Sequence, residues 1–339
     1  MRGIDDPDRV GAWIVDHVPD TVGPFTFELI AGGRSNLTFK LVDAAGRRLV
    51  LRRPPLGHVL ATAHDMAREH RLISAVGLTD VPVPPALGLC TDEAVNGAPF
   101  YMMEFVDGEV LDSAEKTAAL APEVRRTAAF DLIDVLAALH AVDVDVVGLG
   151  DLARRDGYVE RQLKRWSTQW VNSKTRELPA VEEVEQGLRK QIPRQQGSAI
   201  VHGDYRLGNC LTDPVEGRIN AVLDWELCTL GDPLADVGYL GVYWSDEGAL
   251  PRRASDPTAA GGFPKYAEIV ERYAELTGRD VSEIAYYRAF AAFRLAVISE
   301  GVYARYLHGQ MADDGADIAM FKRNVEDLAE GALQALREL

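Results

Sequence analysis

The residues best suited to chemistry lie in one short stretch that begins with an apolar strand. Asp204 follows the apolar run at 199–201, and Asn209 comes five residues later. A predicted hairpin then turns at 213–217 and ends at Asp224. Because a hairpin folds back on itself, we expect Asp224 to return beside Asn209. Two carboxylates and an amide oxygen are hard ligands, suited to Mg²⁺ that carries substrate phosphates.

The order and spacing of these residues match the division of labour in phosphoryl transfer by kinases. In that reaction one Asp accepts the proton of the hydroxyl group, while an Asn five residues on and a later Asp hold the metal ions. The pattern predicts Asp204 as the catalytic base and Asn209 and Asp224 as metal ligands. We expect His202 to orient the loop that carries Asp204, and Asp232 and Asp236 to fix the loop and helix that follow the metal site. Each residue alone is also typical of a polar turn, but the ordered set favours a catalytic segment.

The elements that must support this stretch change in type near residue 107. In the first part, alternating apolar residues and turn signals predict an antiparallel sheet, and helical spacing from Met66 to Gly77 predicts one helix. The expected strands cover 25–30, 37–42, 49–52, 86–90 and 100–106.

In the second part, apolar residues recur at helical spacing. The expected helical stripes are 132–139, 159–170, 266–273, 286–306 and 318–336, interrupted by short strands within 198–224. The sequence therefore predicts an α+β protein with two lobes. A small antiparallel β-sheet lobe covers 1–106, and a larger, mainly helical lobe covers 107–339.

Three segments carry a family resemblance. The stretches HGDYRLGN at 202–209, LDWE at 223–226 and GDPLAD at 231–236 resemble the aminoglycoside phosphotransferase/choline kinase family. The resemblance extends over nearly the whole chain and implies a protein-kinase-like fold. It also implies ATP and Mg²⁺ as cofactors and a hydroxyl group of a small molecule as acceptor. Within the family, 52–55 (RRPP) and 100–108 (FYMMEFVDG) look most like the kinase domains joined to acyl-CoA dehydrogenases.

The resemblance assigns a phosphate-covering role to the loop at 32–36 (GGRSN), which lies between two predicted strands. Gly33, Ser35 and Asn36 would bind the nucleotide there, because glycines let backbone N–H groups approach phosphate oxygens closely. The loop does not have a Walker A sequence, and a Gly-Gly pair between strands is also typical of an ordinary turn.

The resemblance also places a Lys–Glu ion pair beside the phosphates. Glu69 fits this role, since it shares a helical face with apolar residues and its charge needs a partner. The third strand offers Arg52 instead of the family's lysine; arginine can bind phosphate bidentately and still pair with Glu69. Backbone groups of Glu104 and Val106 would bond the adenine ring.

The overall composition excludes some partners. With 36 Lys+Arg against 52 Asp+Glu, the net charge is −16, which disfavours binding to nucleic acid. The sequence has no apolar run that predicts a membrane span, and residues 1–6 lack an apolar signal core. Its three cysteines are not closely spaced. They are expected to be reduced thiols in a cytoplasmic protein.

Two questions stay open at this stage. The acceptor is either a metabolic alcohol, such as a hydroxyacyl-CoA, or an aminoglycoside, and the resemblance favours the former. The absent lysine on the third strand leaves room for a nucleotide-binding regulatory protein with weak or no kinase activity. A protein kinase is disfavoured, because no Ala-Pro-Glu segment follows Asp224.

Overall fold

Two units make up the structure, a computed structural model that describes residues 3–31, 36–56, 65–246, 255–309 and 317–339. The smaller unit comprises Met1–Gly108, Asp145–Leu149 and Asn220–Leu227, and the larger unit comprises Glu109–Val144, Gly150–Ile219 and Cys228–Leu339. Each unit is described by itself. The domain boundary expected after residue 106 stays a prediction.

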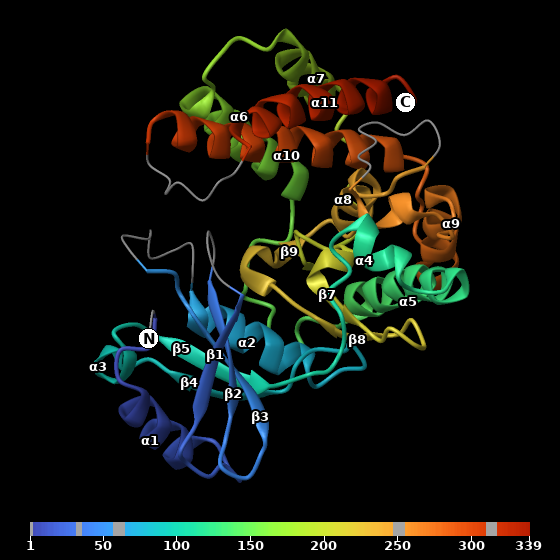
Figure 1. Ribbon diagram of the computed structural model, residues 1–339. Coiled ribbons are helices and arrows are strands. Elements are labelled where there is room, and N and C mark those ends of the chain that lie inside the picture. Colours follow the sequence, from blue (N-terminus) through green and yellow to red (C-terminus); the bar gives the residue numbers. More distant parts are fainter. Residues whose placement is uncertain (1–2, 32–35, 57–64, 247–254, 310–316) are drawn as a thin grey trace. The chain divides into compact units, whose positions relative to one another are not determined.

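The smaller unit is built on a five-stranded antiparallel sheet (Figure 1). The strands are β1 (Thr26–Ala31), β2 (Leu37–Val42), β3 (Arg48–Arg53), β4 (Ala86–Cys90) and β5 (Phe100–Glu104), in the order β1-β2-β3-β5-β4. The expected sheet is therefore confirmed, and the ranges predicted for β2 and β4 match. β5 ends at Glu104 rather than at 106, because Glu104 pairs with Leu49 and β3 begins only one residue earlier.

Side-chain alternation gives this sheet two different faces. The unit's helices are α1 (Pro7–His17), α2 (Met66–Val76) and α3 (Glu93–Asn96). On one face Leu51 and Met102 are fully buried with Ile14 of α1 in a single apolar core. Arg52 and Tyr101, which are register partners in β3 and β5, belong to the opposite face. That face is covered by α2.

Helix α2 begins and ends where the sequence predicts. Asp65 is its N-cap and accepts a hydrogen bond from the N–H of Arg68. Gly77 is at the C-cap, although its φ of −62° is right-handed and not the left-handed conformation common for a capping glycine. Leu72 and Glu69 lie on the buried face, and Glu69 is only 1% exposed. The helix therefore carries a charged group into an apolar interior.

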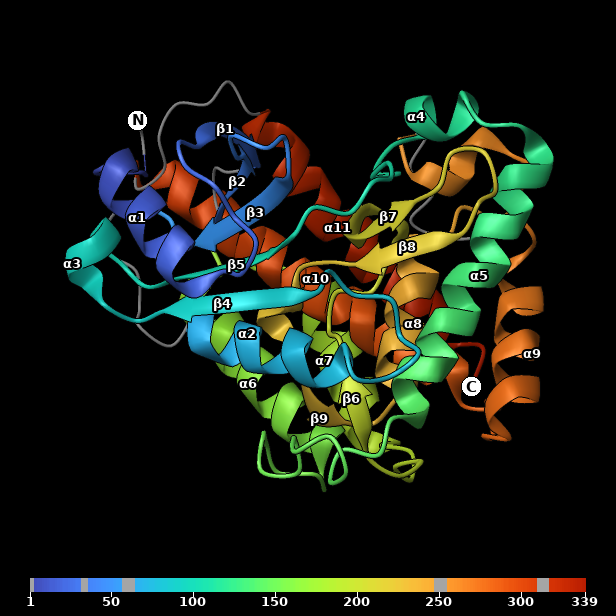
Figure 2. The same cartoon turned by 90° about the horizontal axis from the view of Figure 1, so that it is seen from below.

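The larger unit is mainly helical, as expected. Its helices are α4 (Ala114–Ala118), α5 (Pro122–Ala141), α6 (Tyr158–Ser173), α7 (Pro179–Lys190), α8 (Leu234–Val242), α9 (Tyr266–Thr277), α10 (Ile284–Leu307) and α11 (Ile318–Leu336). Helices α10 and α11 lie side by side (Figure 1), and α5 runs beside α9 (Figure 2). Of the helices described, none combines the length and apolar character needed to cross a bilayer.

Short strands interrupt these helices within 198–224, as the sequence predicts. β6 (Ala199–Val201) pairs antiparallel with β9 (Thr229–Gly231). The 3₁₀ turn η1 (Leu207–Asn209) follows and leads into β7 (Cys210–Thr212). A turn closed by a 2.8 Å hydrogen bond from Asp213 N–H to the Arg218 carbonyl precedes β8 (Ile219–Val222). The loop between β6 and η1 carries Asp204.

Candidate functional site

The loop after β6 holds the predicted base in a defined position. Gly203 adopts a φ of +83°, which a residue with a side chain rarely takes, so the chain can turn sharply between the buried strand and Asp204. The side chain of Asp204 is 20% exposed. It therefore stays open to a substrate while its backbone is fixed.

Two side chains donate hydrogen bonds to the Asp204 carboxylate. Asn209 Nδ2 lies 2.6 Å from Oδ2, and the Tyr239 hydroxyl donates to Oδ1. The guanidinium of Arg206 forms an ion pair with the same carboxylate, with Nε 3.5 Å from Oδ1. Because burial and the nearby Tyr243 and Asp204 raise the pKa of Tyr239 well above its ordinary value, the phenol remains a donor at neutral pH. The amide nitrogen of Asn209 is used by Asp204, and its amide oxygen is the group suited to a cation.

Asp236 anchors the same loop from α8. Its carboxylate accepts hydrogen bonds from the N–H of His202 at 2.6 Å and of Gly203 at 2.8 Å, and His140 Nε2 lies 3.3 Å away. Burial alone would raise the pKa of Asp236, but these bonds and the neighbouring imidazoles leave that pKa below its usual range. The Nδ1 of His202 accepts from the N–H of Asp204 at 3.2 Å. Both residues therefore orient the loop that carries Asp204. This role is the one expected of His202, whereas Asp236 was expected to fix the loop and helix after the metal site.

A second polar cluster lies in the smaller unit, on the α2 face of the sheet. Arg52 Nε lies 3.0 Å from Glu69 Oε2, and Arg52 Nη2 donates to Asp224. The Tyr101 hydroxyl donates to Glu69 at 3.1 Å, and Asn36 Nδ2 donates to its other oxygen at 2.9 Å. The predicted Arg52–Glu69 ion pair is thus present, with three further polar groups around it.

The charges in this cluster depend on one another. Burial raises the pKa of Glu69, and the positive charge of Arg52 opposes that rise. Burial would lower the pKa of Arg52, but Tyr101, Glu69 and Asp224 raise it, so the guanidinium stays charged. Asp224 adopts a left-handed backbone, with φ of +64°, a conformation that Asp tolerates better than most residues. The cluster therefore consists of two carboxylates around one permanent cation.

Arg53 occupies the opposite face of β3, as strand alternation requires. Its Nη1 donates to the carbonyl oxygens of Gly3 at 2.6 Å and Asn96 at 3.0 Å. Of the two adjacent arginines on the third strand, only Arg52 reaches Glu69.

Of the other predicted nucleotide-binding residues, the structure describes Asn36, Glu104 and Val106. Gly33 and Ser35 lie outside the described residues. Asn36 is buried and bonded to Glu69. The N–H of Glu104 donates to the Pro85 carbonyl at 2.9 Å, so this N–H is not available to a ligand. Val106 is half-buried beyond the end of β5. The nucleotide-binding roles of these residues stay predictions.

The predicted triad is divided between the two units. Asp204 and Asn209 belong to the larger unit, which brings them into direct contact. Asp224 belongs to the smaller unit and contacts Arg52. The return of Asp224 beside Asn209 stays a prediction.

Sequence reasoning missed the hydroxyl donors. Tyr239 and Tyr101 each donate to a predicted site carboxylate, and His140 supports Asp236 from α5. One signal was available for Tyr239, because it follows Asp236 by three residues in a helix and so lies on nearly the same helical face. No such spacing marks Tyr101 or His140.

The donor atoms suit magnesium that arrives with a nucleotide. Asn209 and Asp224 offer oxygen ligands, the type that Mg²⁺ prefers, and one or two carboxylates suffice when substrate phosphates complete its shell. Among the described residues, no group of three or more His, Cys, Asp or Glu side chains could hold a metal by itself.

Comparison with known sequences identifies a family. Residues 26–276 match the model of the phosphotransferase enzyme family. Acyl-CoA dehydrogenase family member 10 of Mus musculus is 37% identical over 295 residues, which cover 86% of this chain and 27% of that protein. Acyl-CoA dehydrogenase family member 11 of Gallus gallus is 33% identical over 327 residues, which cover 94% and 41%. The chain thus spans less than half the length of these relatives.

Solved structures share the fold. A crystal structure from Ralstonia eutropha, described as a candidate aminoglycoside phosphotransferase, has a TM-score of 0.83 and 36% identity over 98% of both chains. A thermostable mutant of aminoglycoside phosphotransferase APH(4)-Ia, in a ternary complex with AMP-PNP and hygromycin B, has a TM-score of 0.61, 16% identity and 97% coverage of both chains. The chain therefore has a protein-kinase-like fold and belongs to the phosphotransferase enzyme family.

Proposed function

We propose that the protein is an ATP- and Mg²⁺-dependent phosphotransferase that moves the γ-phosphoryl group to a hydroxyl group of a small molecule. The observation that carries the proposal is the Asp204 carboxylate, which is partly exposed and held by Asn209 and Tyr239. A carboxylate fixed in this way can accept a proton from an incoming hydroxyl group.

In the proposed reaction, Asp204 accepts the proton of the acceptor hydroxyl as its oxygen attacks the γ-phosphorus. The bond from that phosphorus to the bridging oxygen breaks, and ADP leaves. Asp236 keeps the loop in place through its bonds to the His202 and Gly203 N–H groups. Catalysis by this design rests on positioning, because phosphoryl transfer requires little covalent participation by the protein.

Asn209 and Asp224 would hold Mg²⁺ through oxygen atoms, and the ion would neutralise charge on the phosphates. Arg52 would contact the phosphates while it keeps its Nε bond to Glu69. The loop at 32–36 would cover the phosphates, and the backbone of Glu104 and Val106 would receive the adenine ring. AMP-PNP in the APH(4)-Ia complex supports an adenine nucleotide as donor.

For the acceptor, we propose an alcohol of metabolism, such as a hydroxyacyl compound, in preference to an aminoglycoside. Support comes from the relatives at 33–37% identity, which are named as acyl-CoA dehydrogenase family members. The aminoglycoside phosphotransferase APH(4)-Ia is only 16% identical. The free, buried state of Cys90, Cys210 and Cys228 suits a reducing compartment, so we also propose the cytoplasm as the location.

The test is ADP release by the purified chain with Mg²⁺-ATP and a panel of hydroxylated acyl compounds and aminoglycosides. Asp204→Asn should lower kcat about 10²–10⁴-fold, the range for removal of a general base. Asp213→Asn is the matched control, because the side chain of Asp213 accepts backbone hydrogen bonds in the hairpin turn, from the N–H groups of Val215 and Glu216. Unchanged turnover by Asp204→Asn would rule out the proposed base.

One observation favours a second candidate, a nucleotide-binding regulatory protein. Arg52 pairs with Asp224, so a group expected to serve the phosphates already binds a predicted metal ligand. Calorimetry with Mg²⁺-ATP separates the two functions. Binding without ADP release over the whole panel would support the regulatory protein and contradict the phosphotransferase.

A further inference from the structure

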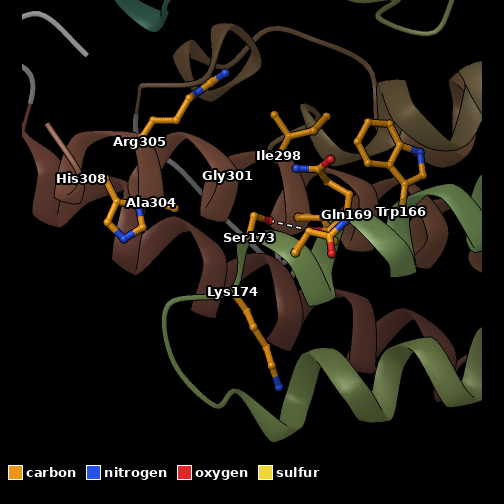
Figure 3. A pocket seen from close by; sticks show the side chains of 11 residues that line it. Trp166, Gln169, Ser173, Lys174, Ile298, Gly301, Ala304, Arg305 and His308 are labelled. Carbon is orange, nitrogen blue, oxygen red and sulfur yellow. Dashed lines mark hydrogen bonds between the residues drawn. The ribbon is translucent and has the colours of Figure 1, made fainter. Parts of the chain in front are cut away.

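A cavity of about 440 Å³ opens between α6 and α10, within the larger unit (Figure 3). Trp166 and Gln169 of α6 and Ile298 of α10 lie toward one end. Arg305 and His308 lie toward the other end. The cavity is thus elongated along α10, with an apolar and amide-lined end and a basic end.

Among the residues that the structure describes, no acidic side chain lines this cavity, although the chain carries a net charge of −16. Lys174 at its edge is neutralised by Glu177 at 3.0 Å and Glu182 at 3.3 Å, and its side chain extends away from the other labelled groups. Arg305 is exposed and, in the described part of the chain, has no hydrogen bond or ion pair. The basic end therefore offers a cation to an anionic ligand.

A series of side-chain contacts links the apolar end of the cavity to the predicted base, Asp204. The guanidinium of Arg294 stacks over the Trp166 ring at 5.4 Å and over the Tyr239 ring at 5.2 Å. Tyr239 in turn donates to Asp204. Trp166, which lines the cavity, is thus linked to the predicted base through the buried side chains of Arg294 and Tyr239.

Helix geometry sets the scale of a ligand that would use both ends. From Arg294 to Arg305 the α10 axis advances about 16 Å at 1.5 Å per residue. A ligand with its hydroxyl group near Asp204 and a charged group near Arg305 must therefore be long. Gln169 and Ser173 line the stretch between and can bond polar groups along it.

We propose that this cavity is the acceptor site and that it selects an elongated anion. The hydroxyl group would lie at the Trp166 end, and a carboxylate or phosphate would bind Arg305 and His308. The proposal rests on the proposed phosphotransferase function and names the substrate class for it. A polycationic acceptor is disfavoured, because the basic end would repel it and the described lining residues offer no carboxylate to pair with it.

The experiment compares three sets of medium-chain acceptors that differ only at the end remote from the hydroxyl group. One set carries a carboxylate, one a phosphate monoester and one a primary amine, and a neutral amide is the reference. Binding is followed without nucleotide by calorimetry and by tryptophan fluorescence, with Trp166→Phe to identify the reporting ring. ADP release is then measured with Mg²⁺-ATP. The carboxylate and phosphate arms show which anion the site prefers.

Two variants test the cavity. Arg305→Glu should reduce the affinity for the anionic acceptors about tenfold or more, since it removes a charge-assisted hydrogen bond and adds repulsion. Gly301→Leu should block the cavity, because a Cβ at Gly301 would lie 3.8 Å from Gln169 Nε2 and 3.9 Å from Ser173 Oγ, leaving room for the first carbon but not for the ligand. Lys164→Glu is the matched control: Lys164 is exposed on α6 and does not line the cavity.

The outcomes separate this proposal from the proposed function. Anion-selective binding and turnover that both depend on Arg305 and Gly301 would support both proposals. Turnover that is insensitive to both variants, or preference for the amine, would overturn the assignment of the acceptor site and leave the phosphotransferase intact. Arg305-dependent anion binding without turnover of any acceptor would overturn the phosphotransferase, and with it the acceptor role of the cavity. Thermal unfolding checks whether Gly301→Leu folds; if it does not, Arg305→Glu, a change at an exposed position, tests the cavity by itself.

Discussion

The carboxylates of the two polar clusters differ in their exposure to solvent. In the smaller unit the side chain of Glu69 is 2% exposed and lies against the guanidinium of Arg52. In the larger unit the side chain of Asp204 is 20% exposed; Asn209 and Tyr239 donate to it, and Arg206 Nε lies 3.5 Å from it. Both carboxylates therefore have a cation nearby, but Glu69 is shielded from solvent, whereas Asp204 keeps contact with it.

This difference separates a supporting role from a chemical one. A buried carboxylate paired with a permanent cation cannot easily exchange protons, and its removal mainly affects stability. A carboxylate that is oriented by hydrogen bonds but still reaches solvent can accept a proton from a ligand. We therefore expect substitutions in the Arg52 cluster to change the free energy of unfolding, and substitutions around Asp204 to change turnover.

The largest expected effect on stability belongs to Arg52→Met. It leaves Glu69 buried without a cation and removes the partner of Asp224, so the free energy of unfolding should fall by about 3–5 kcal/mol. Urea denaturation measures the change. The loss should shrink as the pH is lowered, because burial has raised the pKa of Glu69 and its protonated form needs no cation.

Arg48→Met is the control from the same strand. Arg48 pairs with Asp107, but the two side chains are 43% and 71% exposed, so we expect little change in unfolding. Equal losses from both variants would contradict the claim that burial, rather than ion pairing as such, determines the contribution of Arg52.

The second prediction concerns pH and the anchor of the catalytic loop. Burial lowers the pKa of His140 below its ordinary value of about 6.5, and the unfolded chain recovers that value. As the pH falls below about 6.5, the unfolded state therefore takes up a proton that the folded state does not. Stability should fall by at most about 1.4 kcal/mol for each pH unit between the unfolded and folded pKa values.

His140→Gln should reduce this acid-induced loss, because glutamine does not titrate. It should not remove the loss entirely, since burial also lowers the pKa of His70. A further loss of stability is expected at lower pH, near the ordinary pKa of 3.8 for Asp. Above that pH the depressed pKa of Asp236 contributes to the free energy of unfolding, and this contribution is lost as the carboxylate becomes protonated. The free energy of unfolding is measured from pH 8 to pH 5 for both proteins. An identical pH dependence in the two would show that His140 does not cause the acid-induced loss of stability.

Helices could be predicted from the sequence where one face of the helix is buried and the other is exposed. The stripe Val159, Leu163, Trp166 and Trp170 is wholly buried in α6, as helical spacing predicts. Helix α1 was missed, although its N-cap Asp6 and the proline that follows are sequence signals for a helix start. Helix α7 was missed as well, although its buried residues Val181, Val184 and Leu188 recur at helical spacing. Local periodicity therefore identified several long helices but did not identify every amphipathic one.

In the candidate site, contacts could be predicted between residues that lie close together in the sequence. Asp204 and Asn209 are five residues apart and do touch. The bond of Arg52 to Asp224 joins residues 172 positions apart, and no spacing rule indicates it. Asn36 was assigned to phosphate on the resemblance, but its amide binds Glu69. Which of several polar groups a side chain selects depends on packing that a single sequence does not contain.

The smallest expected effect belongs to Tyr239→Phe. It removes one neutral donor from Asp204 and leaves the Asn209 bond, so kcat should fall by about three- to tenfold, the equivalent of about one hydrogen bond.

Tyr243→Phe is the matched control, since the Tyr243 hydroxyl lies 3.3 Å from that of Tyr239, while Tyr239 makes the bond to Asp204. A fall in kcat of the same size in both variants would point to a structural role for this pair of tyrosines. A fall that occurs in Tyr239→Phe and not in Tyr243→Phe would show that the hydroxyl which donates to Asp204 serves the reaction. In that case the two clusters differ in kind: one carboxylate is buried against a cation for the fold, and the other is partly exposed and oriented by a phenol for the reaction.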